Sequence, residues 1–452
     1  MSLALFSERV FIDGKLLPAS LLIEGDKISK IKAGFFEFKE VDLLHCGSDV
    51  IFPGLIDSHV HINEPGRTDW EGFDTVTKSA AAGGITTLVD MPLNSSPVTT
   101  NIDALNKKLR AAEGKIHVNV GFWGGIIPGN NSDLTALIEG GVLGIKAFTT
   151  HSGIDEFPNV TAYDLLEGMP IIAKYGLPLL VHAELDSSHA NQSLLKENPF
   201  SYQAWLASRP KAWENNAIKM MIDLCRETGC RTHIVHLSSD EGIPLLKEAI
   251  QEGLPMSVEC CPQYLFFCAE DIPDGDTRFK CAPPIREAVN NEQLWNAIKS
   301  GLISMIVTDH SPAPPNIKEI ETGNIAKAWG GISCLELSLP IVWTKARDKG
   351  FAIEDMAKLM SANIADFCNL SSKGEIKEGA CADLMVWAPE DSFTVDQKEM
   401  HFRHKITPYD GQKLYGKIKR TIVNGQLVFD QGSFVSLGEG KKILNAVRSS
   451  NS

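Results

Sequence analysis

The sequence contains the stretch IFPGLIDSHVH at residues 51–61, an apolar run that ends in two histidines. Runs of similar character recur along the chain, and longer stretches with helical spacing, such as 103–113, lie between them. The eight runs are 51–60, 84–93, 116–126, 141–150, 177–185, 230–239, 255–266 and 301–309. Strands that alternate with helices predict parallel βαβ units, and eight strands close a barrel. We therefore predict an α/β fold with a (β/α)8 TIM-like barrel over residues 53–374. An open doubly wound sheet is the competing fold, but no G-x-G-x-x-G motif follows the first run.

Both ends of the chain have the pattern of short β strands. Near the start, 9–12 and 20–23 flank a turn at 13–15, and near the end Asn424-Gly425 interrupts an apolar run. Asn-Gly between apolar runs is a strong hairpin signal. Neither end has enough length for a core of its own, so we predict one small β-sandwich domain built from residues 1–52 and 375–452 together.

The composition is that of an ordinary globular protein. Of the 452 residues, 43% are hydrophobic and 22% are charged, and 43 Lys and Arg against 57 Asp and Glu give a net charge of −14. A surface that acidic repels phosphate backbones, so nucleic acid is not expected as a partner. No apolar run approaches the roughly 18 to 20 residues of a membrane-spanning helix, and no secretory signal is visible at the start. Ten scattered cysteines without a CxxC pair favour reduced thiols in the cytoplasm.

Ionisable side chains lie at the ends of, or within, several of these apolar runs. They are His59 and His61 in the first run, Lys146 in the fourth, His182 in the fifth, His236 in the sixth and Asp309 in the eighth. At the carboxyl ends of barrel strands, such residues face one mouth together. Burial of a single unpaired ionisable group costs several kcal/mol, so the repeated pattern indicates a shared compensating charge, most simply a metal ion. For the HxH pair alone, two surface histidines are an equal alternative.

Lys146 is an unusual metal ligand because an ammonium group is cationic. Reaction with carbon dioxide would turn this lysine into an anionic carbamate, whose two oxygens can bridge two metal ions. An apolar setting lowers the pKa of a lysine and favours the reactive free amine. A buried lysine paired with a carboxylate is the alternative, and spacing alone favours it.

The remaining histidines are weaker candidates. On a regular strand His233 faces the helix layer, because it lies an odd number of residues from His236, and His310 points away from Asp309. His151, five residues after Lys146, is a candidate to overhang the mouth and contact a substrate. The histidines outside the strand-end pattern are His117, His189, His401 and His404.

Taken together, these motifs resemble the amidohydrolase superfamily, in its cyclic-amidohydrolase branch, over about residues 5–430. The motifs that carry the resemblance, besides the histidines and Lys146, are FPGLID at 52–57, GGITT at 83–87, PPIR at 283–286, DHSP at 309–312 and GACADL at 379–384. Dihydroorotases of the similar type have an arginine two residues after the HxH motif, where this chain has Asn63. Hydantoinases have a tyrosine five residues after the lysine, where this chain has His151.

Within that branch the chain resembles allantoinases best. The shared motifs are NEPGR at 63–67 with WEG at 70–72, MPLNS at 91–95, SGIDEFP at 152–158, GN at 323–324, WGG at 329–331 and RHKITPY at 403–409. The resemblance implies hydrolysis of the cyclic amide bond of allantoin, a neutral hydantoin ring with a ureido tail, to allantoate in purine catabolism. A hydantoinase or dihydropyrimidinase is the nearest alternative. A non-catalytic scaffold related to hydantoinases is disfavoured, because all six ligand positions are filled.

The resemblance also implies a binuclear metal centre and its ligands. His59, His61 and Asp309 would hold the first of two divalent ions, for which zinc is favoured. His182 and His236 would hold the second, and carbamylated Lys146 would bridge the two. A hydroxide between the metals would attack the ring carbonyl, with Asp309 as the proton shuttle. The substrate-binding candidates are Asn94, His151, Ala282, Ser311 and Gly331. A homotetramer is expected from the resemblance alone.

Overall fold

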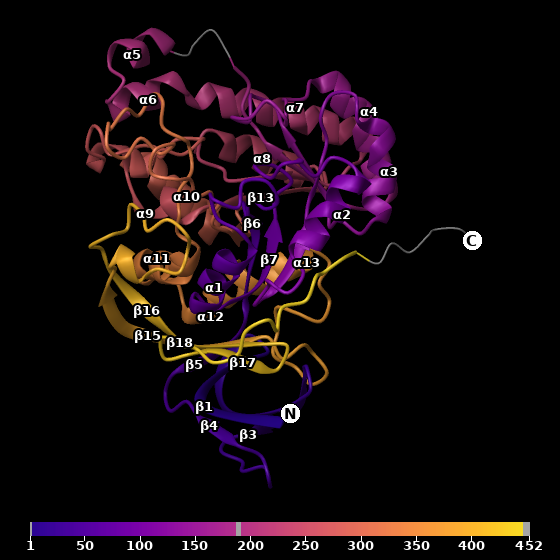
Figure 1. The fold of residues 1–452 in the computed structure, drawn as a ribbon, viewed down its shortest axis with the longest axis vertical. Coiled ribbons are helices and arrows are strands. Elements are labelled where there is room, and N and C mark those ends of the chain that lie inside the picture. Colours follow the sequence, from indigo (N-terminus) through magenta and orange to yellow (C-terminus); the bar gives the residue numbers. More distant parts are fainter. Residues whose placement is uncertain (1, 187–190, 446–452) are drawn as a thin grey trace.

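The computed structural model of the protein describes residues 2–186 and 191–445 and contains a barrel of parallel strands at its centre (Figure 1). The barrel strands are β6 (Leu55–Val60), β7 (Ile85–Asp90), β8 (Asn119–Phe122), β9 (Gly124–Gly125), β10 (Ile145–Phe148), β11 (Leu179–His182), β12 (Thr232–Ile234), β13 (Met256–Cys260) and β14 (Met305–Ile306). They form a three-stranded sheet, β6-β7-β8, and a six-stranded sheet, β14-β13-β12-β11-β10-β9. All pairings within these sheets are parallel, as the alternating strand and helix runs predict.

The two sheets join at both of their edges and close the barrel. Between the last strand and the first, Val60 forms a parallel bridge with His310, whose carbonyl accepts a 2.9 Å hydrogen bond from the His61 N–H. At the other junction the Leu143 N–H donates to the Phe122 carbonyl at 2.9 Å. Only Trp123 separates β8 from β9, so these two count as one strand, and the described residues form a barrel of eight strands. The predicted fold class is therefore confirmed.

Helices cover the outside of the barrel (Figure 1). They are α1 (Phe73–Ala82), α2 (Ile102–Ala111), α3 (Asn131–Glu139), α4 (Ala162–Lys174), α5 (Gln192–Glu197), α6 (Tyr202–Ser208), α7 (Lys211–Thr228), α8 (Gly242–Gln251), α9 (Pro262–Phe266), α10 (Ala288–Lys299), α11 (Ser338–Ala346), α12 (Ile353–Ala357) and α13 (Asn363–Phe367). The run predicted as a strand over 255–266 is a strand only to Cys260. Pro262 then begins α9, because a proline at the first helical position loses no hydrogen bond.

The alternation of side chains along the strands divides the core into two layers. Val89, Trp123, Leu180 and Met305 belong to a cluster inside the barrel, where the Trp123 indole N–H donates to the Ser58 carbonyl at 2.7 Å. A second and larger cluster of buried residues fills the space between the strands and the surrounding helices. The inner cluster fills the barrel with side chains, so the chemistry has to lie at one of its ends.

Both ends of the chain contribute to one nine-stranded sheet below the barrel (Figure 1). Its strands are β1 (Ser2–Ile12), β2 (Lys15–Glu24), β3 (Lys27–Ala33), β4 (Leu43–His45), β5 (Val50–Pro53), β15 (Leu384–Thr394), β16 (Lys413–Val423), β17 (Gln426–Asp430) and β18 (Ser433–Phe434). The antiparallel pairing of β5 with β15 joins the two ends. The first apolar run therefore supplies two strands, β5 to this sheet and β6 to the barrel.

The nine-stranded sheet curls back on itself. The predicted hairpin turn at Asn424-Gly425 joins β16 to β17, and Gly425, at φ +79°, lies so close to Gly25 that a side chain there would collide with its carbonyl. The curled sheet encloses a core that includes Leu21, Ile51 and Leu384. Residues 1 and 446–452 of the predicted β domain lie outside the described residues.

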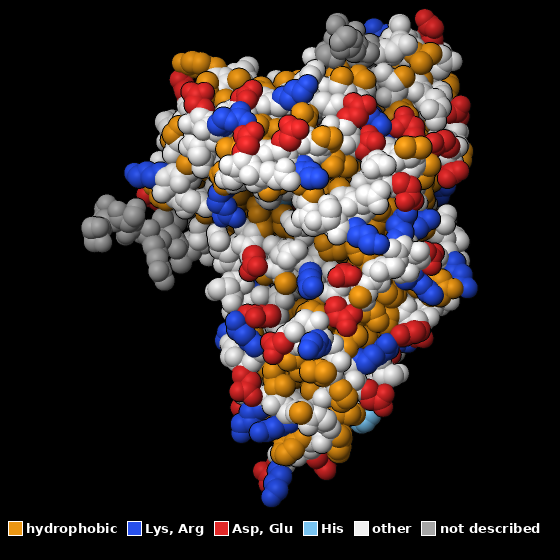
Figure 2. All heavy atoms as spheres, turned by 180° about the vertical axis from the view of Figure 1, so that it is seen from behind, with side chains coloured by type: hydrophobic (Ala, Val, Ile, Leu, Met, Phe, Trp, Pro, Cys, Tyr) orange, Lys and Arg blue, Asp and Glu red, His pale blue; other side chains and the backbone are white. Residues whose placement is uncertain are grey.

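The last described residues leave this sheet and run along the barrel. The Val120 N–H donates to the Lys441 carbonyl at 2.9 Å, and the Ile443 N–H donates to the Val120 carbonyl at 2.8 Å. Acidic and basic side chains are interspersed on the face of the molecule in Figure 2, rather than separated by sign. Among the described residues, none of the helices has the length and apolar character needed to cross a bilayer.

Candidate active site

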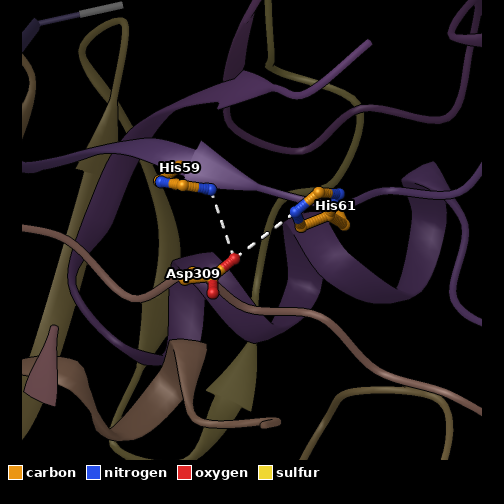
Figure 3. Close-up of side chains that lie close together, drawn as sticks. All are labelled: His59, His61 and Asp309. Carbon is orange, nitrogen blue, oxygen red and sulfur yellow. Dashed lines mark ion pairs between the residues drawn. The ribbon is translucent and has the colours of Figure 1, made fainter. Parts of the chain in front are cut away.

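His59, His61 and Asp309 meet at one end of the barrel (Figure 3). His59 Nε2 lies 3.2 Å from Asp309 Oδ1, and His61 Nε2 lies 3.4 Å from the same oxygen. All three residues are buried, and one ligand atom from each lies within 4.8 Å of the others. The two histidines lie on one face, as the i, i+2 spacing predicts, and two imidazoles with one carboxylate form a donor set suited to a divalent metal ion.

Two residues of this end of the barrel have left-handed backbones. Asp309 has φ +48° and His236 has φ +40°, a conformation that costs a residue other than glycine about 1 to 3 kcal/mol. Such strain is common at functional sites. In both cases the residue follows a short strand, β14 or β12, and its carboxylate or imidazole lines the cavity at the barrel mouth.

The same backbone conformation explains why the expectation for His233 is wrong. His233 does not face the helix layer: its Nε2 lies 3.0 Å from Glu259 Oε2, and its ring packs 4.4 Å from that of Phe367 in the inner core. The prediction counted residues along a regular strand back from His236. Because the strand ends at Ile234 and His236 is left-handed, side chains an odd number of residues apart both point inward here.

The other predicted ionisable residues lie beside this cluster. The ring centroids of His182 and His236 are 4.6 Å apart, and those of His59 and His236 are 5.4 Å apart. Phe148 stacks on His182 at 4.5 Å and has the Lys146 Nζ 5.2 Å from its ring centroid. The structure thus brings the predicted strand-end residues together.

Lys146 is fully buried, and its Nζ has no hydrogen-bond partner. Within the described ranges no carboxylate pairs with it, so the lysine–carboxylate pair that spacing favours is not formed. Burial lowers the pKa of Lys146 to about 8. A buried free amine that forms no ion pair can react with carbon dioxide, and the resulting carbamate would add a negative charge beside the neutral imidazoles.

Glu259, on β13, is a functional residue that sequence reasoning missed. Its Oε1 lies 2.5 Å from His59 Nδ1, and its Oε2 lies 3.0 Å from His233 Nε2. These histidines hold the pKa of Glu259 well below its usual value, in spite of its burial. A carboxylate on the second nitrogen of an imidazole fixes the ring and its tautomer, which leaves His59 Nε2 free to bind a metal. A buried glutamate in the strand 256–260 was the available signal.

Glu184 fixes the ring of His182 in the same way that Glu259 fixes the ring of His59. His182 Nε2 lies 2.7 Å from Glu184 Oε2, and Arg209 Nε donates to Glu184 Oε1 at 3.1 Å. The Arg209 guanidinium and the His182 ring lower the pKa of Glu184 to about 2. With Nε2 held in this way, His182 presents Nδ1 as its remaining ligand atom.

The residues at this end of the barrel fit a bound metal. Burial lowers the pKa of His59 and His182, and lowers that of His236 well below its ordinary value, which favours the neutral ring that a metal ligand needs. His236 Nδ1 and Lys146 Nζ are both buried without hydrogen-bond partners. Buried polar atoms without partners are rare unless an ion, water or ligand completes them.

A cavity of about 260 Å³ opens onto the cluster and contains most of the predicted substrate contacts. Asn94, His151, Ala282 and Ser311 line it together with His59, His61, His182, His236 and Asp309. Asn94 Nδ2 lies 3.3 Å from His61 Nδ1, and its Oδ1 is buried without a partner, so it can accept a hydrogen bond from a ligand. The His151 side chain is 61% exposed and lies 3.5 Å from Asp155.

Gly331 lies just behind the cavity lining, to which its neighbour Gly330 belongs. The Gly331 N–H donates to the Lys280 carbonyl at 2.9 Å, and its own carbonyl accepts from Lys318. A Cβ at Gly331 would collide with the Ser311 carbonyl, so glycine is required for these two segments to lie side by side. Both backbone polar groups of Gly331 are therefore already bonded within the protein.

Sequence reasoning also missed several further residues of the lining as site residues, among them Trp205, Arg209, Lys280 and Trp329. They lie on loops and on the short helix α6, where no strand periodicity marks them. Of the remaining histidines, His310 is buried 3.5 Å from Glu71, and its Nδ1 accepts from the Cys334 N–H, so it points away from Asp309 as predicted. The other histidines do not line the cavity, and His189 lies outside the described residues.

Comparison with known proteins agrees with this geometry. The model of the amidohydrolase family matches residues 50–428. The chain is 44% identical over 453 residues to an allantoinase of Arabidopsis thaliana, covering 95% of this chain and 88% of that protein. It is 45% identical over 435 residues to an allantoinase of Streptomyces avermitilis, covering 96% and 97%. Its fold matches that of the L-hydantoinase (dihydropyrimidinase) from Arthrobacter aurescens with a TM-score of 0.92 and 29% identity, over 98% of this chain and 99% of that one.

Proposed function

Because the chain belongs to the amidohydrolase family, we propose that it is an allantoinase, which hydrolyses the cyclic amide bond of allantoin to give allantoate in purine catabolism. The near full-length similarity to allantoinases is the observation that carries the choice of substrate. The buried cluster of imidazoles and carboxylate at the barrel mouth supports metal-dependent hydrolysis of an amide.

The proposal includes two divalent metal ions, with zinc favoured by the imidazole and carboxylate donors. His59, His61 and Asp309 would hold one ion, and His182 and His236 the other. Lys146, as its N6-carboxylate, would bridge the two; its buried amine without a partner supports this role. When bound, the metals supply Lewis acidity that activates a water molecule and polarises the ring carbonyl.

The chain's own residues then direct the proton and hold the site in shape. Asp309, whose Oδ1 lies within 3.4 Å of both His59 and His61, would accept the proton from the attacking water and deliver it to the departing ring nitrogen. Glu259 and Glu184 hold the rings of His59 and His182 in one orientation. Burial of the cluster keeps these charges in a medium of low dielectric constant, which strengthens their effect.

Allantoin has no charged group, so its recognition would depend on amide hydrogen bonds. Asn94 and Ser311 offer side-chain groups, Ala282 and Gly330 bring backbone to the cavity, and Gly331 supports this segment from behind the lining. His151 would contact the substrate from the exposed rim. Because buried polar groups lose their partners when a ring with the wrong donors binds, this type of recognition discriminates well between related rings.

A substrate panel tests the proposal. The values of kcat/KM for allantoin, hydantoin, dihydrouracil and dihydroorotate are measured with the metal-loaded protein, and allantoin is expected to have the highest. A higher value for hydantoin or dihydrouracil would instead identify a hydantoinase or dihydropyrimidinase. No turnover of any ring, together with no bound metal, would identify a non-catalytic scaffold.

We also propose that the enzyme acts in the cytoplasm as a homotetramer. All ten cysteines are free thiols, which supports a reducing compartment. The tetramer follows from the resemblance to the family. Cell fractionation tests the first statement, with recovery in an organelle as the opposing result, and light scattering after size-exclusion chromatography tests the second.

A further inference from the structure

Two buried lysines, Lys280 and Lys318, lie beside the cavity without a carboxylate partner. Their exposed fractions are 5% and 4%, and in the part of the chain that the structure describes neither forms an ion pair. Burial lowers the pKa of each to about 7. Because a buried amine without a countercharge is costly, each needs a compensating set of acceptors.

Backbone carbonyls of one loop supply most of these acceptors. Lys280 Nζ donates to the carbonyls of Ala326 at 3.2 Å and Ala328 at 2.6 Å. Lys318 Nζ donates to the carbonyls of Lys280 at 2.9 Å, Trp329 at 3.1 Å and Gly331 at 2.5 Å. The loop 326–331 is therefore bound to both lysines, and its residues 327–330 line the cavity.

Lys280 differs from Lys318 because it lines the cavity itself. An ammonium group has three donors, and the two loop carbonyls use two of them. The Lys280 Nζ also lies 4.4 Å from the ring centroid of Trp205, another residue of the lining. In its protonated form Lys280 therefore has one N–H left for an acceptor in the cavity, and such an acceptor would favour that form.

The acceptor for the free N–H of Lys280 would belong to a part of the substrate that does not react. Lys280 and Asp309 line the same cavity, so a ring whose amide lies at Asp309 can present its substituent to Lys280. The ureido tail of allantoin begins on the carbon next to the ring carbonyl and ends in an acceptor oxygen and N–H donors. Donors on Lys280 and carbonyls on the adjacent loop complement both.

We propose that Lys280 is a specificity-determining residue that binds the carbonyl oxygen of the substrate's ureido tail, and that Lys318 is a positioning residue that holds the loop around it. This inference rests on the proposed function, because only a substrate with such a tail would use the contact. It predicts that the loss of Lys280 lowers the activity on allantoin more than the activity on the bare hydantoin ring.

The test compares allantoin with hydantoin, which has the same ring without the tail, in the metal-loaded enzyme. Lys280→Met is expected to lower kcat/KM for allantoin about 10- to 100-fold, chiefly by raising KM. A loss of this size is typical when a hydrogen bond from a charged group is removed. The value for hydantoin should fall by a smaller factor, no greater than the fall caused by Lys318→Met, because Lys280 also bonds to the loop carbonyls of Ala326 and Ala328. Where hydantoin turnover is too slow to follow, its inhibition constant against allantoin serves instead. Equal losses for both rings, or no loss for allantoin, would overturn the proposal.

Further variants separate recognition from folding. Lys280→Arg keeps a donor and is expected to retain the preference for allantoin over hydantoin within about threefold; loss of that preference would contradict the role of the donor. Lys318→Met should lower both activities together, because it acts through the loop, and a loss confined to allantoin would contradict that role. Lys247→Met, on the exposed face of α8, controls for removal of a lysine. Failure of the wild-type enzyme to hydrolyse allantoin at all would refute the proposed function instead.

Discussion

The cavity has two walls of different construction. The strand-end wall consists of His59, His61, His182, His236 and Asp309, whose positions are set by barrel strands. The loop wall consists of Lys280 and residues 327–330, which no strand positions. In the strand-end wall, carboxylates beside His59 and His182 hold these rings in orientation. In the loop wall Lys280 bonds to backbone carbonyls, as does Lys318 behind it.

This difference indicates that the strand-end wall performs the chemistry and the loop wall selects the substrate. Carboxylates such as Glu259 and Glu184 hold imidazoles rigidly, as bond-breaking chemistry requires. Backbone carbonyls on a loop can be rearranged by substitutions that leave the barrel intact, which suits the choice of substrate. Changes in the strand-end wall should therefore abolish turnover of every ring, and changes in the loop wall should alter the preference among rings.

The largest effect is expected from Asp309→Asn in the strand-end wall. Without a carboxylate to move the proton, kcat should fall about a thousandfold for allantoin and for hydantoin alike. The measurement is steady-state kcat, with circular dichroism and metal content to show that the fold and the ligand set persist. A kcat close to that of the wild type would end the assignment of Asp309 as the proton shuttle.

A smaller effect is expected behind the same wall, from Glu259→Ala. Because His59 and His233 would lose their shared carboxylate, metal affinity should fall about 10- to 100-fold. Competition with a chelator measures this affinity. The matched control is Glu248→Ala on the exposed face of α8, which should change nothing. Unchanged affinity in Glu259→Ala would show that the carboxylate does not support the metal site.

The last effect is expected for Lys318 behind the loop wall, and it changes the pH dependence of stability rather than turnover. The pKa of Lys318 falls from 10.5 to about 7 on burial, so the unfolded state binds more protons between these values. Its contribution to the unfolding free energy therefore increases as pH rises from about 7 toward 10.5. Lys318→Met should show a shallower rise than the wild type in urea unfolding over this range. Parallel curves would contradict the buried, depressed amine.

The barrel and the strand-end wall could be predicted from the sequence, because strand periodicity places residues of neighbouring strands at one mouth. His59, His61 and Asp309 were found in this way. The same periodicity gave a wrong orientation for His233. The left-handed backbone at His236 changes the face on which the His236 side chain lies, and no local sequence motif marks this backbone conformation.

The loop wall could not be predicted in the same way. Lys280 acquires its role from carbonyls 46 and 48 residues further along the chain, a contact that depends on how the loops fold over the mouth. Glu259 was open to prediction as a buried glutamate on a strand, but its partners His59 and His233 come from two other strands.

Lys146, as we propose, completes a metal centre on the strand-end wall, and metal analysis of Lys146→Ala tests this role most directly. The wild-type protein should bind two divalent ions per chain, and Lys146→Ala should lose bound metal and allantoin hydrolysis together while it keeps the fold by circular dichroism. Added short-chain carboxylic acids, which can occupy the vacated space, should restore part of both. A Lys146→Ala enzyme that is fully metallated and active would contradict the account.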